Sequence, residues 1–186
     1  KELCLLQLGC FDFQVVIDVT TIDINFYKSL LEDKTKVFLG WNLKFDAKFL
    51  LHQRIILREI WDGFTAERLL HNGYPKSIYK LSLKAAGFSY LQVELDKTVR
   101  GKIIWSKSLT DDIVEYAAGD VKYLEKLMEA QMVEIRKHGL EIALDYQNHF
   151  VVICAYFEYC GVKLDVNLWK QKMAKDRIVY DQAVNE

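Results

Sequence analysis

Two short segments carry side chains that suit phosphodiester chemistry. Asn42 and Asp46 stand four residues apart in segment 40–46, and Tyr116 and Asp120 stand four residues apart in segment 116–121. Residues with this spacing project from the same face of a helix. Carboxylates are the hard oxygen ligands that Mg²⁺ and Mn²⁺ prefer, so the two segments together offer one side of a two-metal hydrolytic site.

Each segment by itself also has a plainer interpretation. Asp120 adjoins an apolar helical stripe, where a carboxylate is costly unless it is paired or bound to metal, but it could equally lie half-exposed at the edge of that stripe. Asn42 and Asp46 could simply cap the helix that follows them. Their place after a strand is, however, where α/β proteins commonly carry functional residues.

The elements that would position these residues alternate between strands and helices. Apolar and β-branched runs predict strands over 3–8, 14–19 and 37–41, the first of them stopped by Gly9. Helical spacing of apolar residues predicts helices over 24–32, 44–53 and 62–70. This alternation indicates an α/β domain.

The second half of the chain is predicted to be largely helical. A short helix begins at Ser82 and ends at Gly87, and a basic, aromatic surface loop covers 88–107. Thr110 is predicted to cap a long helix that runs to Lys137, with Asp111 and Asp112 in its first turn. Residues 142–186 are predicted to be helical again, with a break over 161–165.

Length and composition leave several classes open and exclude others. The 186 residues suit one domain, alone or with a short piece of another. A net charge of -1 gives no overall signature of nucleic-acid binding. The range from Gly73 to Lys107 is locally basic, however, because it contains seven cationic residues and only two acidic ones. The four cysteines lack metal-knuckle spacing and are expected to be reduced in a cytoplasmic protein, and no apolar run is long enough to span a membrane.

Taken together, the two segments resemble the motifs of DEDD-type 3′–5′ exonucleases. Segment 40–46 (GWNLKFD) is similar to the second exonuclease motif, G-x-N-x-K-[FY]-D, and segment 116–120 (YAAGD) to the third, Y-x-x-x-D. Trp61-Asp62, Ser82-Leu83-Lys84 and Leu109-Thr110 resemble the connecting landmarks in the same order. The resemblance covers residues 3 to about 135, and it is strongest to the proofreading domain of DNA polymerase I-like (family A) enzymes.

The last part of the chain carries a second resemblance. Segment 158–165 (EYCGVKLD) is similar to the E-x-x-G-[VI]-x-[LI]-D run that opens the polymerase domain in family A enzymes. A turn between two helices at a glycine would give a similar pattern. The resemblance implies an exonuclease-like domain over 1–137 and the start of a polymerase domain over 138–186.

The implied fold is an RNase H-like mixed sheet flanked by helices. The family's first motif, D-x-E, lies on a central strand of that sheet, and it is expected before Lys1. Asp18-Val19-Thr20 is a poor substitute, because its third residue is Thr and it lies too close to Asp46. The resemblance therefore predicts a D-x-E strand between the strands over 3–8 and 37–41.

The resemblance also implies roles for individual residues. Asp46 and Asp120 would be ligands of two Mg²⁺ or Mn²⁺ ions, and Tyr116 would orient the attacking water. Asn42 would support the site or the terminal nucleotide, Trp41 would stack on a base unless it is buried at its strand end, and Lys44 would contact the nucleic acid.

Three functions fit these residues. The first is proofreading, in which a single-stranded or frayed 3′ end of DNA is degraded beside the remainder of a polymerase polypeptide. The second is an inactive exonuclease fold that only supports a polymerase, although the presence of Asp46, Tyr116 and Asp120 argues against such decay. The third is an RNase D-like RNA exonuclease, which the segment over 158–165 disfavours.

Overall fold

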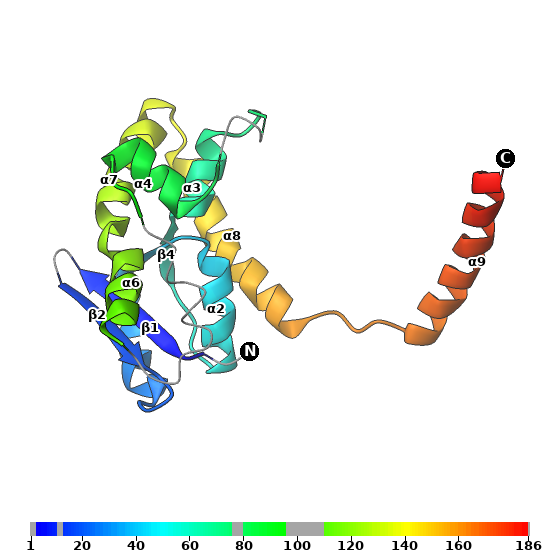
Figure 1. Ribbon diagram of the computed structural model, residues 1–186, viewed down its shortest axis with the longest axis horizontal. Coiled ribbons are helices and arrows are strands. Elements are labelled where there is room, and N and C mark those ends of the chain that lie inside the picture. The colour runs from blue at the N-terminus through cyan, green and yellow to red at the C-terminus, as the bar shows by residue number, and fades with distance from the viewer. Residues whose placement is uncertain (1–2, 11–12, 76–79, 96–109, 186) are drawn as a thin grey trace.

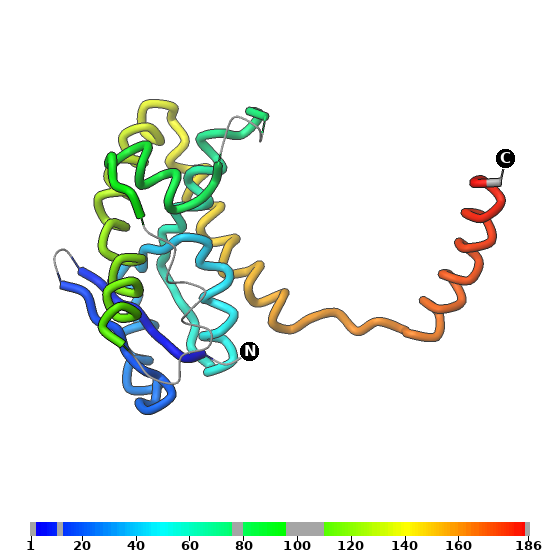
Figure 2. The backbone as a smooth tube through the Cα atoms, in the orientation of Figure 1, coloured from blue at the N-terminus to red at the C-terminus, as the bar shows by residue number. Residues whose placement is uncertain are grey.

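The computed structural model describes residues 3–10, 13–75, 80–95 and 110–185. Figure 1 shows a body in which helices α6 and α7 lie on one side of the strands and α2 and α8 on the other, with α9 extending away from it. The backbone tube in Figure 2 follows the same path. The α/β class is therefore confirmed, and helices dominate the described part of the chain.

The strands form two pairs. β1 (Leu5–Cys10) pairs with β2 (Phe13–Asp18) in antiparallel register, and β3 (Val37–Gly40) pairs with β4 (Glu59–Asp62) in parallel register. The first three were predicted, although β1 continues through Gly9 instead of stopping there. β4 was missed because its short sequence holds only two apolar residues between two acids.

The single mixed sheet that was predicted is not present among the described residues. They form two separate two-stranded sheets, because no described strand pairs with both β1 and β3. One edge of β1 and one edge of β3 therefore have no strand partner within the described ranges. A D-x-E strand between them stays a prediction.

The helices of the first half follow the predicted order with local differences. Residues 24–32 split into the 3-10 helix η1 (Ile24–Tyr27) and α1 (Lys28–Leu31). α2 (Leu43–His52) and α3 (Gly63–Leu70) lie close to their predicted ranges.

Helix α4 (Leu83–Leu91) was predicted to end at Gly87, and that prediction was wrong. Leu83, Ala86 and Gly87 are all buried, so packing against α7 holds the helix together despite the glycine. The predicted loop over 88–107 is therefore wrong at its start, and its residues 96–107 lie outside the described ranges.

The long helix predicted over 110–137 is two helices. α6 (Asp111–Lys122) and α7 (Leu124–Lys137) meet at Tyr123, a turn residue with φ -105° and ψ 0°. The two helices have different partners, since α6 packs on β1 and β2 whereas α7 packs on α3, α4 and β3. Thr110 occupies the N-cap position, but its side chain makes no capping hydrogen bond.

Two further helices complete the chain. α8 (Glu141–Cys160) and α9 (Val166–Asn185) are separated at the predicted break, where Gly161 has a φ of 66° and a ψ of -179°. α8 packs against α2, α3 and β4, so it belongs to the body of the fold. The predicted division at 137/138 stays a prediction, and the residues of α9 from 166 to 180 are all exposed.

The largest apolar cluster lies where α2, β4 and α8 meet. Its buried members include Ala47, Leu51, Ile60, Val151 and Ala155. None of the described helices is long and apolar enough to cross a membrane. Cys10, Cys154 and Cys160 form no disulfide in the described part of the chain.

The turn from β3 into α2 has two backbone requirements. A Cβ atom at Gly40 would lie 2.3 Å from the Leu43 side chain, so only glycine fits there without a shift. Asn42 adopts the left-handed conformation, with φ 64° and ψ 48°. Glycine and asparagine tolerate this conformation better than other residues.

This turn generates a prediction for Asn42. We expect Asn42→Ala to lower the free energy of unfolding by about 1 kcal/mol, because a Cβ without a compensating polar group is strained in left-handed geometry. Asn42→Gly is the matched control and should change it by less than about 0.5 kcal/mol. Urea denaturation monitored by circular dichroism measures both, and equal stability of the two variants would contradict the assigned turn geometry.

Candidate active site

A buried carboxylate organises the start of α2. Asp62 ends β4 directly opposite Gly40 of β3, and its side chain is almost completely buried. Its Oδ1 accepts hydrogen bonds from the backbone N–H groups of Asn42 (2.6 Å) and Leu43 (3.3 Å). The carboxylate thereby satisfies backbone donors at the beginning of the helix that carries Asp46.

The other contacts of Asp62 join it to α3 and α8. Its Oδ2 accepts a hydrogen bond from Thr65 Oγ1 at 2.8 Å, and its backbone N–H donates to Asn148 Oδ1 at 3.1 Å. Burial raises the pKa of the Asp62 carboxyl group, and the hydrogen bonds from Thr65, Asn42 and Leu43 oppose that shift.

Asp46 lies in the first turn of α2, close enough to Asp62 to be affected by its charge. Desolvation by the surrounding protein raises the pKa of the Asp46 carboxyl group to about 6, and the negative charge of Asp62 adds to the shift. The residue as a whole is nevertheless exposed, so water also reaches it. A carboxylate that is short of positive partners but open to solvent is suited to a cation.

Tyr116 and Asp120 lie on α6, as predicted, and both are half-buried. α6 packs on the β1–β2 pair, where a Cβ atom at Gly9 would come within 3.2 Å of Val121. That these residues and Asp46 form one metal site stays a prediction. Within the described ranges, no three or more His, Cys, Asp or Glu side chains gather closely enough to bind an ion.

Trp41 is half-buried and packs against the interior. Its ring lies over Gly63, where a Cβ atom would come within 2.8 Å of it, and it meets Phe64 edge-on with a centroid distance of 6.5 Å. It also packs against the apolar cluster formed by α4 and α7. Stacking of Trp41 on a base stays a prediction, and its packing supports the alternative of a buried tryptophan at the end of the strand.

Lys44 is held by an ion pair. Its Nζ lies 2.5 Å from Glu158 Oε1, and Lys48 Nζ lies 2.5 Å from the other oxygen, Glu158 Oε2. Contact of Lys44 with nucleic acid stays a prediction. Of the cations in the basic stretch, Lys80 and Lys84 are described and exposed, while Lys76, Lys97, Arg100, Lys102 and Lys107 lie outside the described ranges.

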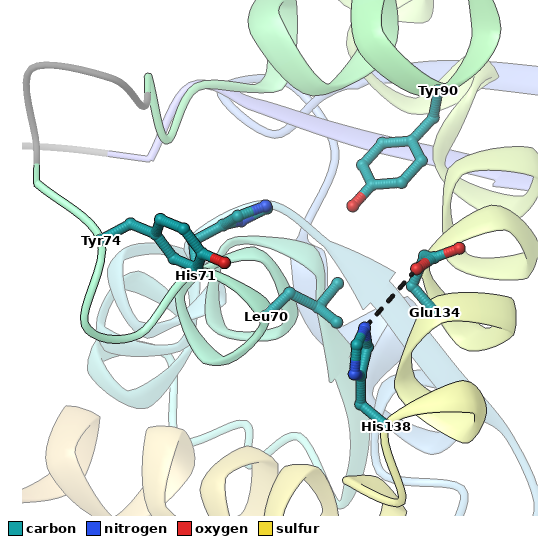
Figure 3. Close-up of a pocket in the computed structure, with 6 residues that line it drawn as sticks. All are labelled: Leu70, His71, Tyr74, Tyr90, Glu134 and His138. Atoms are coloured by element: carbon teal, nitrogen blue, oxygen red, sulfur yellow. Dashed lines mark ion pairs between the residues drawn. The ribbon is translucent and has the colours of Figure 1, made fainter.

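A separate pocket of about 320 Å³ opens between the ends of α3 and α7 and helix α4 (Figure 3). It is lined by Leu70, His71, Tyr74, Tyr90, Glu134 and His138, and none of the site residues predicted from sequence is among them. Beside it, the buried Glu67 accepts a hydrogen bond from Gln131 Nε2 at 2.9 Å. Burial and the charge of Glu67 raise the pKa of Tyr90, so its hydroxyl stays protonated.

Sequence reasoning missed two residues that build the site. Asp62 was seen only as a landmark, although a hydroxyl three residues later, at Thr65, was a signal for a capping interaction. Asn148 gave no signal, because an asparagine within a long helix is usually exposed.

Comparisons with known proteins agree with this architecture. Residues 1–136 match the family model described as 3′–5′ exonuclease. No curated protein matches the chain by sequence.

Solved structures share the fold at low sequence identity. A structure described as the apo form of a nuclease has a TM-score of 0.77 and 22% identity, over 89% of this chain and 80% of that one. NrnC of Brucella melitensis has a TM-score of 0.76 and 21% identity, over 86% and 78%. RNase D of Escherichia coli, an exoribonuclease involved in structured RNA processing, has a TM-score of 0.71 and 23% identity, over 82% of this chain and 40% of that one.

The raised pKa of Asp46 gives a prediction with a defined sign. Because the folded state binds this proton more tightly than the unfolded chain, stability contributed by Asp46 is lost as pH rises from about 4 through about 6. Asp46→Asn should match the wild type below this window and be more stable above it. Solvent screening limits the gain to about 1 kcal/mol. Urea denaturation between pH 4 and 8 measures it.

Asp33→Asn is the control of opposite sign. Hydrogen bonds from Thr35, followed by Lys36, lower the pKa of Asp33 to about 2, so its charged form is favoured by folding. This substitution should lower stability above about pH 4. A destabilised Asp46→Asn variant at pH 8 would contradict the environment described for Asp46.

Proposed function

Because this chain belongs to the 3′–5′ exonuclease family, we propose that it removes nucleotides from single-stranded 3′ ends with Mg²⁺ or Mn²⁺ as cofactor. The observation that carries the proposal is the place of Asp46 on the first turn of a helix whose start is anchored by the buried Asp62. Such anchoring fixes a carboxylate beside solvent, where a scissile phosphate can approach.

The residues fit a hard divalent cation. Asp46 and Asp120 would hold it through carboxylate oxygens, the ligands that Mg²⁺ and Mn²⁺ prefer. Desolvation, and after it the negative charge of Asp62, raises the pKa of Asp46, and a bound cation would favour the charged carboxylate. When bound, the metal supplies Lewis-acid activation of water and neutralises charge on the phosphate.

The chain's own groups would supply orientation. The Tyr116 hydroxyl would hold the attacking water by a hydrogen bond. Asn42 is exposed at the start of α2, one turn before Asp46, where its amide could contact the terminal nucleotide. Both roles rest on the resemblance to the family's motifs.

RNA is the substrate that the structural neighbours favour. Among them, RNase D is described as an exoribonuclease, and NrnC has been solved with Mg²⁺ and with pGG. These neighbours fit an RNase D-like exonuclease better than a proofreading domain. We therefore propose short single-stranded RNA as the first substrate to test.

Proofreading within a family A polymerase is the second candidate. A specific sequence feature favours it, namely the segment over 158–165 and its resemblance to the opening of a polymerase domain. A DNA 3′ end would then be the substrate, and the remainder of the polymerase the partner. An inactive supporting fold is the third possibility and is separated from both by the assay below.

The activity prediction uses the full-length protein and a 5′-labelled single strand. We expect stepwise loss of 3′ nucleotides in Mg²⁺ or Mn²⁺ and none in EDTA. Asp46→Asn and Asp120→Asn should each lower kcat by about a hundredfold or more, because each removes a metal ligand. Asp112→Asn, an exposed position in the first turn of the same helix as Asp120, is the matched control and should retain activity.

Running the assay on matched RNA and DNA strands separates the two substrates. Faster degradation of RNA supports the RNase D-like function, and a preference for DNA with a frayed 3′ end supports proofreading. Absence of activity on both, in protein that is folded and loaded with metal, would leave the supporting fold as the function.

A further inference from the structure

Helix α8 lies beyond the residues that match the exonuclease family, which end at 136. It nevertheless contacts both α2, which carries Asp46, and β4, which ends at Asp62. Figure 1 shows α8 alongside α2 over much of its length. Between them, Val151 and Ala155 of α8 are buried against the apolar residues of α2. A helix outside the family match thus packs against the helix that carries Asp46.

Two residues of α8 make polar contacts with β4 and α2. Asn148, which is 7% exposed, accepts a hydrogen bond from the backbone N–H of Asp62. Ten residues later, Glu158 bridges Lys44 and Lys48 on α2. At a rise of about 1.5 Å per residue, these contacts lie about 15 Å apart along α8.

Glu158 stands where an acid is unfavourable for the helix itself. It lies two residues before the end of α8, and the helix dipole places partial negative charge at that end. Its two lysine partners offset this cost, and they lower the pKa of Glu158 to about 2, so that the carboxylate is charged throughout the neutral range.

The position of the lysines on α2 determines what this contact can do. Lys44 and Lys48 are four residues apart and share the face of α2 that meets α8. Asp46 lies midway between them in sequence, about 200° around the helix from each, and therefore projects from the opposite face. The buried side chains of α2 set its rotation about its own axis, and holding both lysines would further restrain that rotation and with it the direction of Asp46.

We propose that Glu158 is a positioning residue of the exonuclease site, which acts by fixing the rotation of the helix that carries Asp46. The proposal rests on the exonuclease function proposed above. Exposed ion pairs contribute little to stability, so the contact should affect the geometry of α2 far more than the free energy of unfolding. Asp62 holds the start of the same helix, and Glu158 holds the face of that helix that meets α8.

The test compares three variants of the full-length protein. Glu158→Gln removes the charge, and Glu158→Lys repels both lysines. The third variant combines Lys48→Glu with Glu158→Lys, which rebuilds the ion pair between these two positions with reversed charges and leaves Lys44 unchanged. Asp176→Asn, which breaks an exposed i,i+4 pair with Lys172 on α9, is the matched control.

Two readouts are needed. The first is nuclear magnetic resonance of the α2 amides and of the Asp46 carboxyl carbon, which follows the orientation of α2 whether or not the protein is active. The second is steady-state exonuclease kinetics. We expect shifted α2 and Asp46 resonances in Glu158→Gln and Glu158→Lys, with kcat lowered about tenfold and KM within about twofold. Relative to Glu158→Lys, the reversed pair should restore part of the α2 resonances and of kcat, and Asp176→Asn should change neither.

Either of two results would overturn the proposal. One is an α2 spectrum and a kcat in Glu158→Gln that match those of Asp176→Asn. The other is a lower KM with unchanged kcat, which would mean that Glu158 withholds Lys44 and Lys48 from phosphate. If the wild type has no exonuclease activity, the proposed function fails, while the resonances of α2 still decide whether Glu158 orients that helix.

Discussion

The burial of one carboxylate, that of Asp62, constrains the part of the structure on which the site depends. A buried charge is costly unless donors surround it, and the donors here come from the start of α2 and from α3. The backbone N–H groups of Asn42 and Leu43 are two of these donors. A movement of the β3–α2 turn would therefore leave the buried carboxylate without hydrogen-bond donors. The left-handed conformation of Asn42 and the glycine at position 40 follow from the tightness of this turn.

The same constraint distributes charge across the site. Burial raises the pKa of both carboxyl groups, but Asp62 accepts hydrogen bonds inside the fold, whereas Asp46 is exposed to solvent. One carboxylate therefore supports the framework, and the other remains available for chemistry. α8 adds to the framework from the opposite side through Asn148 and Glu158, so the exonuclease fold and the helix beyond its family match form one packed unit.

Much of this arrangement could be predicted from the sequence, because local patterns specify local structure. The spacing of apolar residues located most helices, and the two motifs placed Asp46 on α2 and Asp120 on α6. The predictions that were wrong concern features that depend on contacts between distant segments. Packing carries α4 through Gly87, and different partners divide α6 from α7 at Tyr123. Neither the Asn148–Asp62 bond, 86 residues apart, nor the Glu158 bridge leaves a local signature.

We propose that Asp46 and Asp120 serve one metal-dependent site. A crystal structure of the full-length protein grown with Mn²⁺, with the ions located by anomalous scattering, tests it most directly. We expect manganese bound to both carboxylates, which should lie within about 8 Å of each other, the span of two ions at ~4 Å and their ligand bonds. Carboxylates farther apart than this, or manganese bound to neither, would contradict it.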